Sequence, residues 1–472
     1  MVKNWLADAD PATAWAHQAW TDFAALPQKE YAVVVLPVHA LVRRQAGEPI
    51  DLEETRGGAL LRRAIERVNS RFAVRVLPPL RFVPGTGPAS VFGLDPETAH
   101  DLVAEIVADV NAAGFHKLVF FNTSPALEPF VAAAAVDART GPGLRAYLVH
   151  ARSLGFDAAL DQSAELAARA GHLAALLTEI RGHLAPPPAA PAADSPAASA
   201  AGGPAFPDYR DRYLPALSAG RLAALAGTSR TLAIVPVGAI EQHGPHLPVG
   251  VDAILGQAML GAALARVPPD LPVVVAPPIT FGKSTEHRGY PGTVSLSTRT
   301  LRRLALAITG QVRDLGIGRV AFLNTHGGNR AVLAAILREP RAIVGVDAVV
   351  LRPGHAPGIA PQEDAWGFHA AEWETSLLLA CAPELVHLDR AVAEYPVRLD
   401  DPGELRPGRS RATFAWMTRD LSRSGVIGDP TKATPEKGTR WLSIAAEALA
   451  ARIAALQVGE DGWSGDGDLT FI

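Results

Sequence analysis

An internal duplication constrains the fold more than any other feature of this sequence, because the same order of segments occurs twice within 472 residues. In each copy, two apolar runs rich in Val, Ile and Leu precede a stretch with helical periodicity, and a third apolar run follows it. A chain of this length rarely folds around one core, so the duplication favours two similar units. The matching segments are YAVVVLPVHAL, VLPPLRF and ETAHDLVAEIVADVNAAGFHKLVFFNTS in the first copy, and LAIVPVGAI, VAPPITF and TRTLRRLALAITGQVRDLGIGRVAFLNTH in the second.

Short β-branched runs alternate with helix-period segments in both copies, which is typical of βαβ units and a parallel sheet. We therefore predict an α/β fold with two tandem domains, each a mainly parallel sheet flanked by helices. Residues 185–207 are almost wholly Ala, Pro, Ser and Gly, a composition that indicates a linker. The predicted domains are residues 1–184 and residues 208–472.

The charge of the chain argues against two classes of partner. Its formal net charge is −4, its pI is near 6.4, and its Lys and Arg residues are scattered, so we expect no nucleic-acid surface and no binding to an anionic membrane. No segment approaches the roughly 20 apolar residues that span a bilayer, and the N-terminus lacks the basic and apolar regions of a signal peptide. The sequence predicts a cytoplasmic protein that takes a small-molecule or peptide ligand.

Ionisable residues follow two of the apolar runs in the second copy. Glu241 and His243 come after LAIVPVGAI, and on an extended segment residues two apart point the same way. Asp252 follows across a loop with Pro and Gly, and His326 ends the third run. Because ligands gather at the carboxyl ends of parallel strands, we expect these residues to converge. Their mixed nitrogen and oxygen atoms suit zinc, manganese or iron, whereas calcium prefers oxygen alone.

Two further candidates lie in HAAEWETS, where His369 and Glu374 open a probable helix. Each of these residues also has a structural interpretation, since a lone His is often a hydrogen-bonded core residue and a carboxylate near a strand end can cap the next helix. The joint occurrence of several such residues favours a site.

Four more residues are candidates for the substrate pocket, and each has an alternative role. His246 either lines the site or holds its loop. Glu286 and His287 border the pocket or form a surface pair, and the pocket is favoured because YPGT, which follows them, indicates a tight turn. Trp366 is either a core aromatic or a lid over the substrate.

The first copy differs from the second at these polar positions. It keeps the apolar frame and lacks most of the ionisable groups, which predicts an inactive domain. At constant offset, Val42, Arg44 and Glu53 stand where the second copy has Glu241, His243 and Asp252. By local sequence match, Ser124 stands where the second copy has His326, Leu177 falls at Glu374, and His172 matches His369.

Five motifs occur in order over about residues 209–456, namely VPVGAIEQHGPHLP, HRGYPGT, NTHGGN, HAAEWETS and GVIGDPTKATPEKG. Together they resemble the creatininase (creatinine amidohydrolase) family, which also includes a formamidopyrimidine-type deformylase and the peptidase that trims the mycofactocin precursor. The first half resembles the same family only in its frame of strands and helices.

The resemblance implies a compact α/β domain with a two-metal site, which would hold two ions of zinc, manganese or iron per chain. Carried over by motif, Glu241 and His326 would bind one ion and His243 the other, with Asp252 bridging them. In creatininase, a carboxylate completes the coordination shell of the second ion, and Gly328 stands at that position here. Either Glu374 supplies that carboxylate here, which we favour, or the second ion is weak or absent.

The resemblance also implies the chemistry. The expected activity is that of a metal-dependent amidohydrolase, which cleaves a cyclic or linear C–N amide bond with metal-activated water. His369 resembles the catalytic histidine of the family and would shuttle the proton, although it could instead cap a helix or support the site. The alternatives are a peptidase or tailoring hydrolase of a biosynthetic pathway, similar to the mycofactocin-precursor peptidase, and a non-enzymatic binding protein that contains a metal.

The predicted inactive first copy suggests how chains of this protein assemble into an oligomer. Members of the family typically form hexamers, so a fused inactive copy would take one subunit position in each pair. This predicts a homo-oligomer, a trimer of two-domain chains that mimics a hexamer. A second hypothesis is that the first copy binds a peptide or a partner and presents it to the second.

Overall fold

The computed structural model describes residues 9–458, apart from residues 46, 69–72, 86, 157–162, 183–206, 226–229, 354–356 and 398–414. The linker expected at 185–207 therefore lies outside the described residues, except for Pro207. Within the described ranges, no helix is both long enough and apolar enough to cross a bilayer.

The two halves each contain a four-stranded sheet in which every neighbouring pair of strands is parallel. This confirms the expected α/β fold with helices on both faces of parallel sheets. The strand order is β2-β1-β3-β4 in the first half and β6-β5-β7-β8 in the second. The strands are β1 (Val33–Val38), β2 (Val74–Val76), β3 (Lys117–Asn122), β4 (Arg145–His150), β5 (Leu232–Val237), β6 (Val273–Val275), β7 (Arg319–Asn324) and β8 (Asp347–Leu351).

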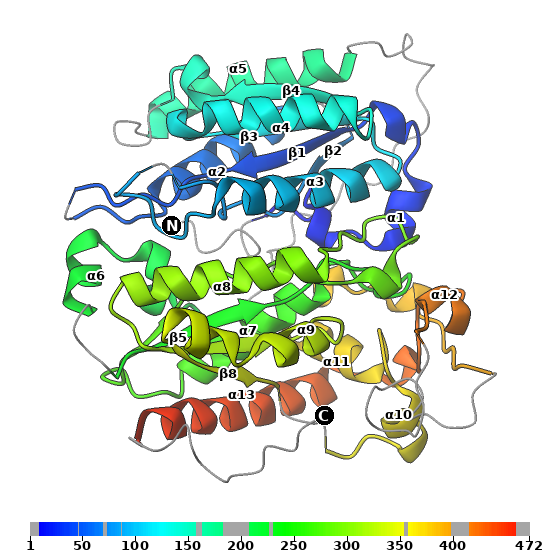
Figure 1. Ribbon diagram of the computed structural model, residues 1–472. Helices are drawn as coiled ribbons and strands as arrows, with labels where there is room; N and C mark the ends of the chain where they lie inside the picture. The colour runs from blue at the N-terminus through cyan, green and yellow to red at the C-terminus, as the bar shows by residue number, and fades with distance from the viewer. Residues whose placement is uncertain are drawn as a thin grey trace.

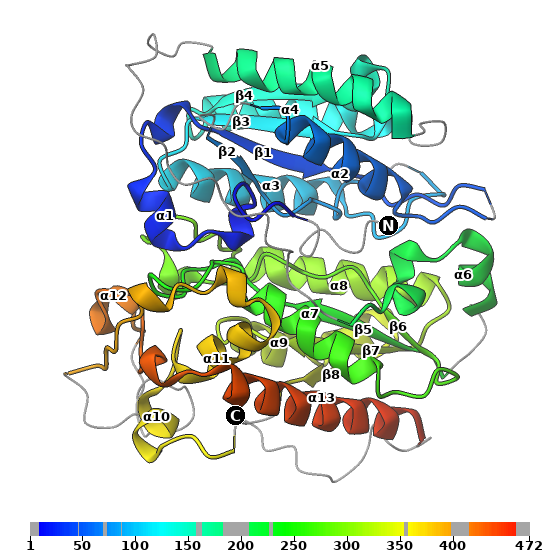
Figure 2. The ribbon, with the colours of Figure 1, turned by 180° about the vertical axis from the view of Figure 1, so that it is seen from behind.

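Helices connect the strands and cover the sheets, as Figures 1 and 2 show from opposite sides. In the first half they are α1 (Trp20–Ala25), α2 (Leu52–Ile65), α3 (Pro96–Ala112), α4 (Glu128–Thr140) and α5 (Ser163–Gly182). In the second half they are α6 (Ala219–Leu225), α7 (Val251–Leu264), α8 (Thr298–Asp314), α9 (Asn329–Ile336), α10 (Pro361–Trp366), α11 (Glu372–Cys381), α12 (Thr418–Leu421) and α13 (Pro435–Val458).

The duplication extends to single hydrogen bonds. Val42 N donates to Ile50 O at 3.3 Å, and at the same place in the second half Glu241 N donates to Val249 O at 2.9 Å. The strand registers also correspond, since β1 and β3 align in the same way as β5 and β7. The main chain therefore supports the pairing of Val42 with Glu241.

Alternate side chains of each central strand enter different cores, as the period of a strand requires. In β1, Val33 and Val35 pack in an outer core beneath α2 and α5, whereas Val34 and Leu36 enter a central core. In the second half an equivalent outer core lies beneath α13. The central core is continuous across both halves, so the two sheets form one packed molecule.

The halves face each other through α3 and α8, which pack together between the two sheets (Figure 1). Two main-chain hydrogen bonds cross the interface in a reciprocal way: Asp51 N donates to Pro215 O at 2.8 Å and Gly250 N donates to Ala16 O at 2.9 Å. In such an isologous contact, the same two surface patches meet twice around a twofold axis.

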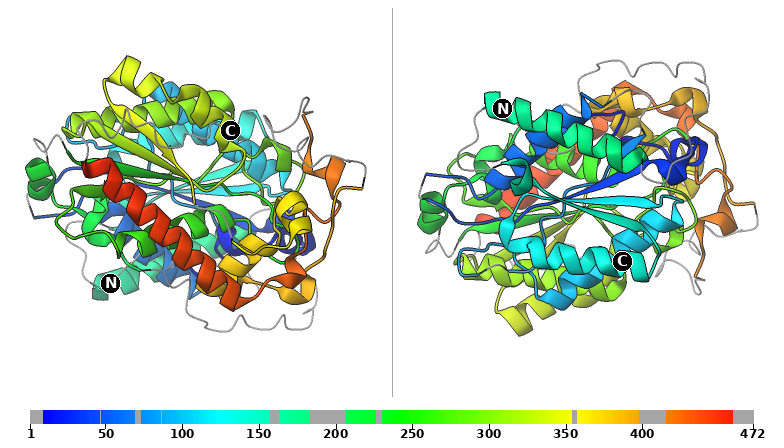
Figure 3. Two further views of the ribbon diagram at one scale, coloured as in Figure 1. Left: turned by 90° about the horizontal axis from the view of Figure 1, so that it is seen from below. Right: turned by 90° about the horizontal axis from the view of Figure 1, so that it is seen from above.

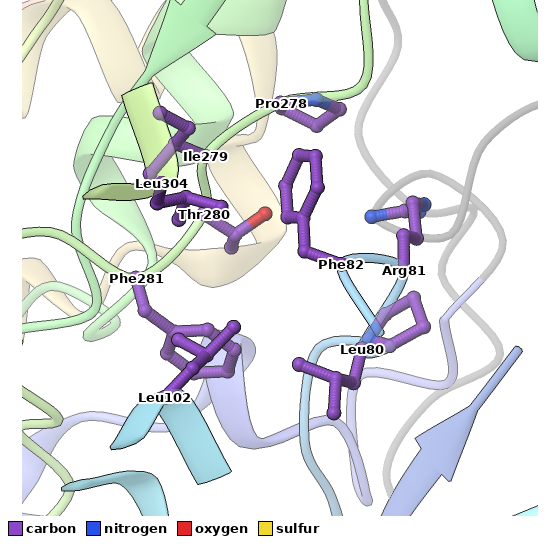
Figure 4. A pocket seen from close by; sticks show the side chains of 10 residues that line it. Leu80, Arg81, Phe82, Leu102, Pro278, Ile279, Thr280, Phe281 and Leu304 are labelled. Carbon is purple, nitrogen blue, oxygen red and sulfur yellow. The ribbon is translucent and has the colours of Figure 1, made fainter. Parts of the chain in front are cut away.

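A cavity between the halves follows the same pseudo-symmetry (Figure 4). The segment after β2 faces the segment after β6 across it, and α3 and α8 each add a leucine. Most of its lining is apolar, and none of the candidate metal ligands belongs to it. The lining residues are Pro79, Leu80, Arg81, Phe82, Leu102, Pro278, Ile279, Thr280, Phe281 and Leu304.

Helix α5 corresponds to α13 and not to the segment that carries His369. Helix α5 lies against α2 as α13 lies against α7, and Figure 3 shows the two helices across the outer faces of their halves. In both helices a basic side chain from a strand donates to a main-chain carbonyl of the last turn. Lys117 Nζ of β3 donates to Arg181 O of α5 at 2.6 Å, and Arg319 of β7 donates to Leu456 O of α13 at 3.3 Å.

This arrangement corrects the match of His172 and Leu177 to His369 and Glu374, which was wrong. Residues 151–162 separate β4 from α5, whereas residues 352–434, with α10, α11 and α12, separate β8 from α13. The sequence alone does not distinguish the two possible counterparts of α5, because α11 and α13 are both rich in Ala and Leu.

Candidate metal centre

The candidate ligands come from the ends of two neighbouring strands and from two helices that contact each other, α7 and α11. Glu241 and His243 follow β5, Asp252 lies in the first turn of α7, His326 follows β7, and Glu374 lies in the first turn of α11. Apart from Glu374, whose side chain is 21% exposed, all of them are buried.

Hydrogen bonds near the end of β7 fix the positions of two of these residues. The amide of Asn324 donates to His326 O at 2.8 Å and holds the turn after the strand. The hydroxyl of Thr325 donates to Asp252 O at 2.8 Å and joins this turn to α7. The same Asn-Thr pair makes the turn after β3 in the first half, where Ser124 takes the place of His326.

Glu241, Asp252 and His326 form one cluster of ligand atoms. His326 Nδ1 lies 3.2 Å from Glu241 Oε1 and 3.4 Å from Asp252 Oδ2. Ligand atoms about 2.0–2.2 Å from a shared ion lie on the order of 3.0–3.5 Å from one another. These separations are therefore those of a coordination shell.

His243, His369 and Glu374 form a second cluster. His243 Nε2 lies 3.9 Å from Glu374 Oε2 and 3.9 Å from Asp252 Oδ1. The two oxygens of Asp252 thus approach imidazoles of different clusters, the arrangement required of a carboxylate that bridges two ions. The residues expected from the motifs to bind metal all lie together here.

Main-chain carbonyl groups orient three of the imidazoles. Nδ1 of His243 donates to Glu241 O at 3.0 Å, Nε2 of His326 donates to Lys283 O at 2.8 Å, and Nε2 of His369 donates to Gln242 O at 2.7 Å. A carbonyl oxygen only accepts, so the bonded nitrogen carries the proton. The other nitrogen of each neutral ring then directs a lone pair at the centre, as metal-binding histidines do.

Three buried atoms of this centre lack a hydrogen-bond partner. Glu241 Oε2, His243 Nε2 and Asp252 Oδ2 are buried without a hydrogen bond, although buried polar atoms almost always have one. All three are electron-pair donors. A divalent cation would satisfy them together, so the residues present fit a metal site.

The pKa values in the metal-free centre show the same need for positive charge. Burial and the neighbouring carboxylate of Glu241 raise the pKa of Asp252 well above its usual range. Burial lowers the pKa of His326, but Glu241 and Asp252 outweigh it and raise that pKa to about 10. Without an ion, protons must therefore occupy the centre, and metal binding must release them.

His287 lies in the centre itself, whereas the sequence predicted it only as a border of the pocket. Its Nε2 is 3.4 Å from Glu241 Oε1, and its ring centroid lies 4.2 Å from that of His369. Burial lowers its pKa well below the usual value. Its neighbours Gln242 and Thr418 were missed, because no spacing in the sequence marks a hydrogen bond between such distant segments.

The other three residues predicted to line the pocket, His246, Glu286 and Trp366, do not belong to the clusters of ligand atoms. His246 Nε2 bonds to Thr375 Oγ1 at 2.9 Å and its carbonyl accepts from His387 N, so it holds the loop. Glu286 Oε1 lies 4.0 Å from His326 Nε2, on the side away from the centre. Trp366 ends α10 and is half-buried.

Gly328 has no room for a side chain. A Cβ atom there would lie 2.2 Å from Lys283 O and 2.5 Å from His326 Nε2. A carboxylate at this position would therefore displace a candidate ligand. Glu374 is held in place instead by Ala370 N, which donates to its Oε2 at 2.6 Å.

Comparison with known proteins adds independent findings. A family model for creatininase, described as creatinine amidohydrolase, matches residues 217–453, half of the chain. The mycofactocin precursor peptide peptidase of Mycolicibacterium smegmatis is 38% identical over 233 residues, which cover 49% of this chain and 87% of that protein. Creatinine amidohydrolase of Pseudomonas putida is 30% identical over 237 residues, covering 46% of this chain and 86% of that protein.

Two more similarities are more distant. The 3-dehydro-scyllo-inosose hydrolase of Thermotoga maritima is 30% identical over 233 residues, covering 44% of this chain and 71% of that protein. A solved structure described as "Creatininase Mn" aligns with a TM-score of 0.44 and 25% identity, covering 52% of this chain and 99% of that chain.

Proposed function

The chain belongs to the creatininase family, and from that premise we propose that its second half is a metal-dependent hydrolase that cleaves a C–N amide bond. One observation carries the proposal: carboxylate oxygens and imidazole lone pairs converge on a buried place where three of those atoms have no partner. Among the described residues no hydrogen-bond donor satisfies these three atoms, so a cation is the matching ligand.

Two divalent ions, of zinc, manganese or iron, would occupy this centre. Glu241 and His326 would hold the first, His243 and Glu374 would hold the second, and Asp252 would bridge them. The mixed donor set supports these metals, and the division follows the two clusters of ligand atoms. The contact between Glu374 and Ala370 N keeps the Glu374 carboxylate at the second cluster.

When bound, the ions would supply an ionised water near neutral pH and polarise the carbonyl of the substrate. The chain supplies the proton transfer. Nε2 of His369 is committed to Gln242 O, so Nδ1, 3.8 Å from Glu241 Oε1, is the nitrogen that can take up a proton and return it to the leaving amine. Burial of the centre keeps bulk water out.

The substrate amide has two candidate classes. A small cyclic or linear amide is the first, supported by similarity to creatinine amidohydrolase. A peptide is the second, and one finding favours it: the peptidase of the mycofactocin precursor is 38% identical, against 30% for creatinine amidohydrolase. Either substrate would use the same two clusters.

The first half, in this proposal, is an inactive copy that takes the position of a partner subunit. It has Val42, Arg44 and Ser124 where the second half has ligand candidates, and its contacts with the second half are reciprocal. Three such chains would then form a six-domain assembly. A mass measurement that gives a single chain in solution would count against the assembly.

Metal analysis of the full chain tests the site. We expect two divalent ions per chain in the native protein and loss of at least one in Glu241→Gln and in His326→Ala. Glu53→Gln, which changes the first-half counterpart of Asp252, is the matched control and should keep both ions. Full metal content in both site variants would refute the assignment.

Activity is tested with the metal-loaded chain against two panels, small cyclic and linear amides and short synthetic peptides. Hydrolysis in either panel that disappears in Glu241→Gln supports the enzyme and identifies the substrate class. Metal-loaded protein that is inert toward both panels would instead support a non-enzymatic binding protein.

A further inference from the structure

Four imidazoles approach the Glu241 carboxylate, and one of them differs from the rest. The outer nitrogens of His243, His326 and His369 each donate to a main-chain carbonyl, so the nitrogen that faces the centre is the one available to a metal ion. His287 has no such carbonyl contact in the described residues. Its outer nitrogen, Nδ1, instead lies 2.9 Å from Gln242 Nε2 and 2.8 Å from Thr418 Oγ1.

The amide of Gln242 can adopt only one orientation here. Its Oε1 accepts from Gly244 N at 2.9 Å, and its Nε2 donates to Gly425 O at 3.0 Å. A flipped amide would place an NH₂ group against an N–H and an oxygen against a carbonyl. The group that faces His287 is therefore an N–H donor.

The space for this amide exists because residue 425 is glycine. Gly425 has a φ of +91°, and a Cβ atom there would lie 1.9 Å from Gln242 Oε1. The amide is thus enclosed between two stretches of main chain, and it has little freedom to rotate. Gln242 is 0% exposed to solvent.

An N–H donor at Gln242 requires an acceptor at Nδ1 of His287. A proton on Nδ1 would place two donors 2.9 Å apart, so both the other tautomer and the doubly protonated ring are disfavoured. The hydroxyl of Thr418 fits either way, since it can donate to His287 Nδ1 or to Glu286 O at 3.0 Å. The ring proton is then on Nε2, 3.4 Å from Glu241 Oε1.

We propose that His287 is a fixed N–H donor to the Glu241 carboxylate and not a metal ligand, and that Gln242 is the positioning residue that sets its tautomer. The inference rests on the proposed function and extends it. Oε1 of Glu241 has two lone pairs, so it can accept from His287 Nε2 and still face the first ion beside His326 Nδ1. The donor role of His287 also rules out the third possible ligand group, Glu241, His287 and His369, as an ion site.

Nitrogen-15 NMR of the histidine rings tests the tautomer directly in the full chain, with and without zinc. The chain has 14 histidines, and His287→Gln identifies the signal of His287. We expect a neutral ring with the proton on Nε2 in both states. A proton on Nδ1, or an Nε2 signal shifted by zinc coordination, would overturn the proposal whether or not the centre is catalytic.

Metal affinity, measured by competition with a chelator, tests the role. His287→Gln places an amide N–H near the position of Nε2 and should keep the affinity within about threefold, whereas His287→Leu should lose about 10- to 100-fold. Gln242→Glu presents an acceptor to Nδ1 and should shift the ring proton to Nδ1. Equal affinity of His287→Leu and the native chain would refute the role.

The two proposals fail in different ways. A native chain that binds no divalent ion would refute the proposed function, while the NMR result would still decide the tautomer. Native binding of two ions together with a His287→Leu variant of unchanged affinity would refute only the donor role. Unfolding temperatures of all variants show whether a loss of affinity reflects loss of the fold.

Discussion

Ala370 has a backbone conformation that residues other than glycine seldom adopt, with a φ of +52°. It lies between His369 and α11, and this conformation directs its N–H at Glu374 Oε2, 2.6 Å away. The left-handed region costs a residue with a Cβ atom about 1–2 kcal/mol. Ala370 orients a candidate ligand, and backbone strain is frequent at residues that position functional groups.

Substitutions at Ala370 should separate the backbone conformation from the side chain. We expect Ala370→Gly to keep both ions, because glycine adopts this φ without strain and retains the N–H. Ala370→Val should lose the second ion and about 2 kcal/mol of stability or more, because a β-branched residue is strongly disfavoured there. Metal content and unfolding temperature measure both effects, and equal behaviour of the two variants would contradict this account.

His39 gives the first half a defined sensitivity to acid. Burial lowers its pKa to about 4, and of its charged neighbours Glu54 raises the pKa and Arg81 lowers it. Between pH 6.5 and 4 the unfolded chain therefore binds a proton that the folded chain does not. Stability is fully present above pH 6.5 and falls by about 3 kcal/mol as the pH falls through this range.

The variant His39→Gln should remove this contribution. Its free energy of unfolding is expected to depend less steeply on pH between 6.5 and 4, by about one proton, than that of the native chain. Denaturant unfolding at a series of pH values measures the slope. Parallel curves for the two proteins would show that His39 does not titrate as the structure implies.

At this scale the sequence revealed candidates by residue type and spacing alone. Glu241 and His243 could be predicted to point the same way because they are two residues apart on an extended segment. The role of Gln242 could not, because it depends on a glycine nearly two hundred positions later that leaves room for the amide. Contacts of this kind depend on loop conformation, which no local pattern determines.

At the scale of elements, a short N-terminal segment supports the loops of the candidate metal centre. Gln18 O accepts from Val249 N at 2.8 Å, and Val249 O accepts from Glu241 N at 2.9 Å. Trp15 Nε1 donates to Gly292 O at 2.8 Å, and Trp20 Nε1 donates to Ser424 O at 3.1 Å. Residues of the first half thus connect through the main chain to a candidate ligand.

Gly250 packs tightly against the N-terminal segment at Ala16. A Cβ atom at Gly250 would lie 2.5 Å from Ala16 O, and Gly250 precedes α7, which carries Asp252. Gly250→Ala should therefore destabilise the chain by about 1–3 kcal/mol and reduce its metal content. Gly310→Ala is the matched control: nothing lies within 4 Å of a Cβ atom there, and it should stabilise α8 by about 0.4–1 kcal/mol.

Thermal unfolding and metal analysis distinguish these two variants. An unchanged metal content in Gly250→Ala, with a stability like that of Gly310→Ala, would show that the N-terminal segment does not position α7.

Elements were predicted best where an apolar run was strong. The runs AVVVLPV, LAIVPV, KLVFF and RVAFLN all contain strands of the two sheets, because a strand covered on both faces needs a continuous apolar sequence. The place of α5 could not be predicted in the same way. An Ala- and Leu-rich helix fits against either of two partners, and only packing decides between them.

At the scale of the whole molecule, the two halves bury the contact that two identical subunits would make. The reciprocal hydrogen bonds of Asp51 and Gly250, and the central core that both sheets share, are features of a homodimer interface contained within one chain. The described residues of the first half form no group of candidate metal ligands. The packing surface of this half nevertheless supports the second half.

In the first half, an arginine pairs with the carboxylate that corresponds to the candidate metal ligand Asp252. Arg44, at the position of His243, pairs with Glu53, at the position of Asp252, and the Glu53 side chain is only 4% exposed. The guanidinium group therefore supplies, in the first half, the positive charge that a cation would supply in the second. A buried carboxylate without such a partner costs several kcal/mol.

Substitution of both partners tests this exchange of a residue for an ion. Arg44→Met should destabilise the chain by about 1–3 kcal/mol, less than a fully buried pair because the Arg44 side chain is 29% exposed. The double variant Arg44→Met with Glu53→Gln should recover most of that loss, since no charge then remains unpaired. Neither variant should change the metal content, because the candidate metal ligands lie in the second half. A double variant as unstable as Arg44→Met would show that the arginine contributes by packing and not by replacing the charge of a metal.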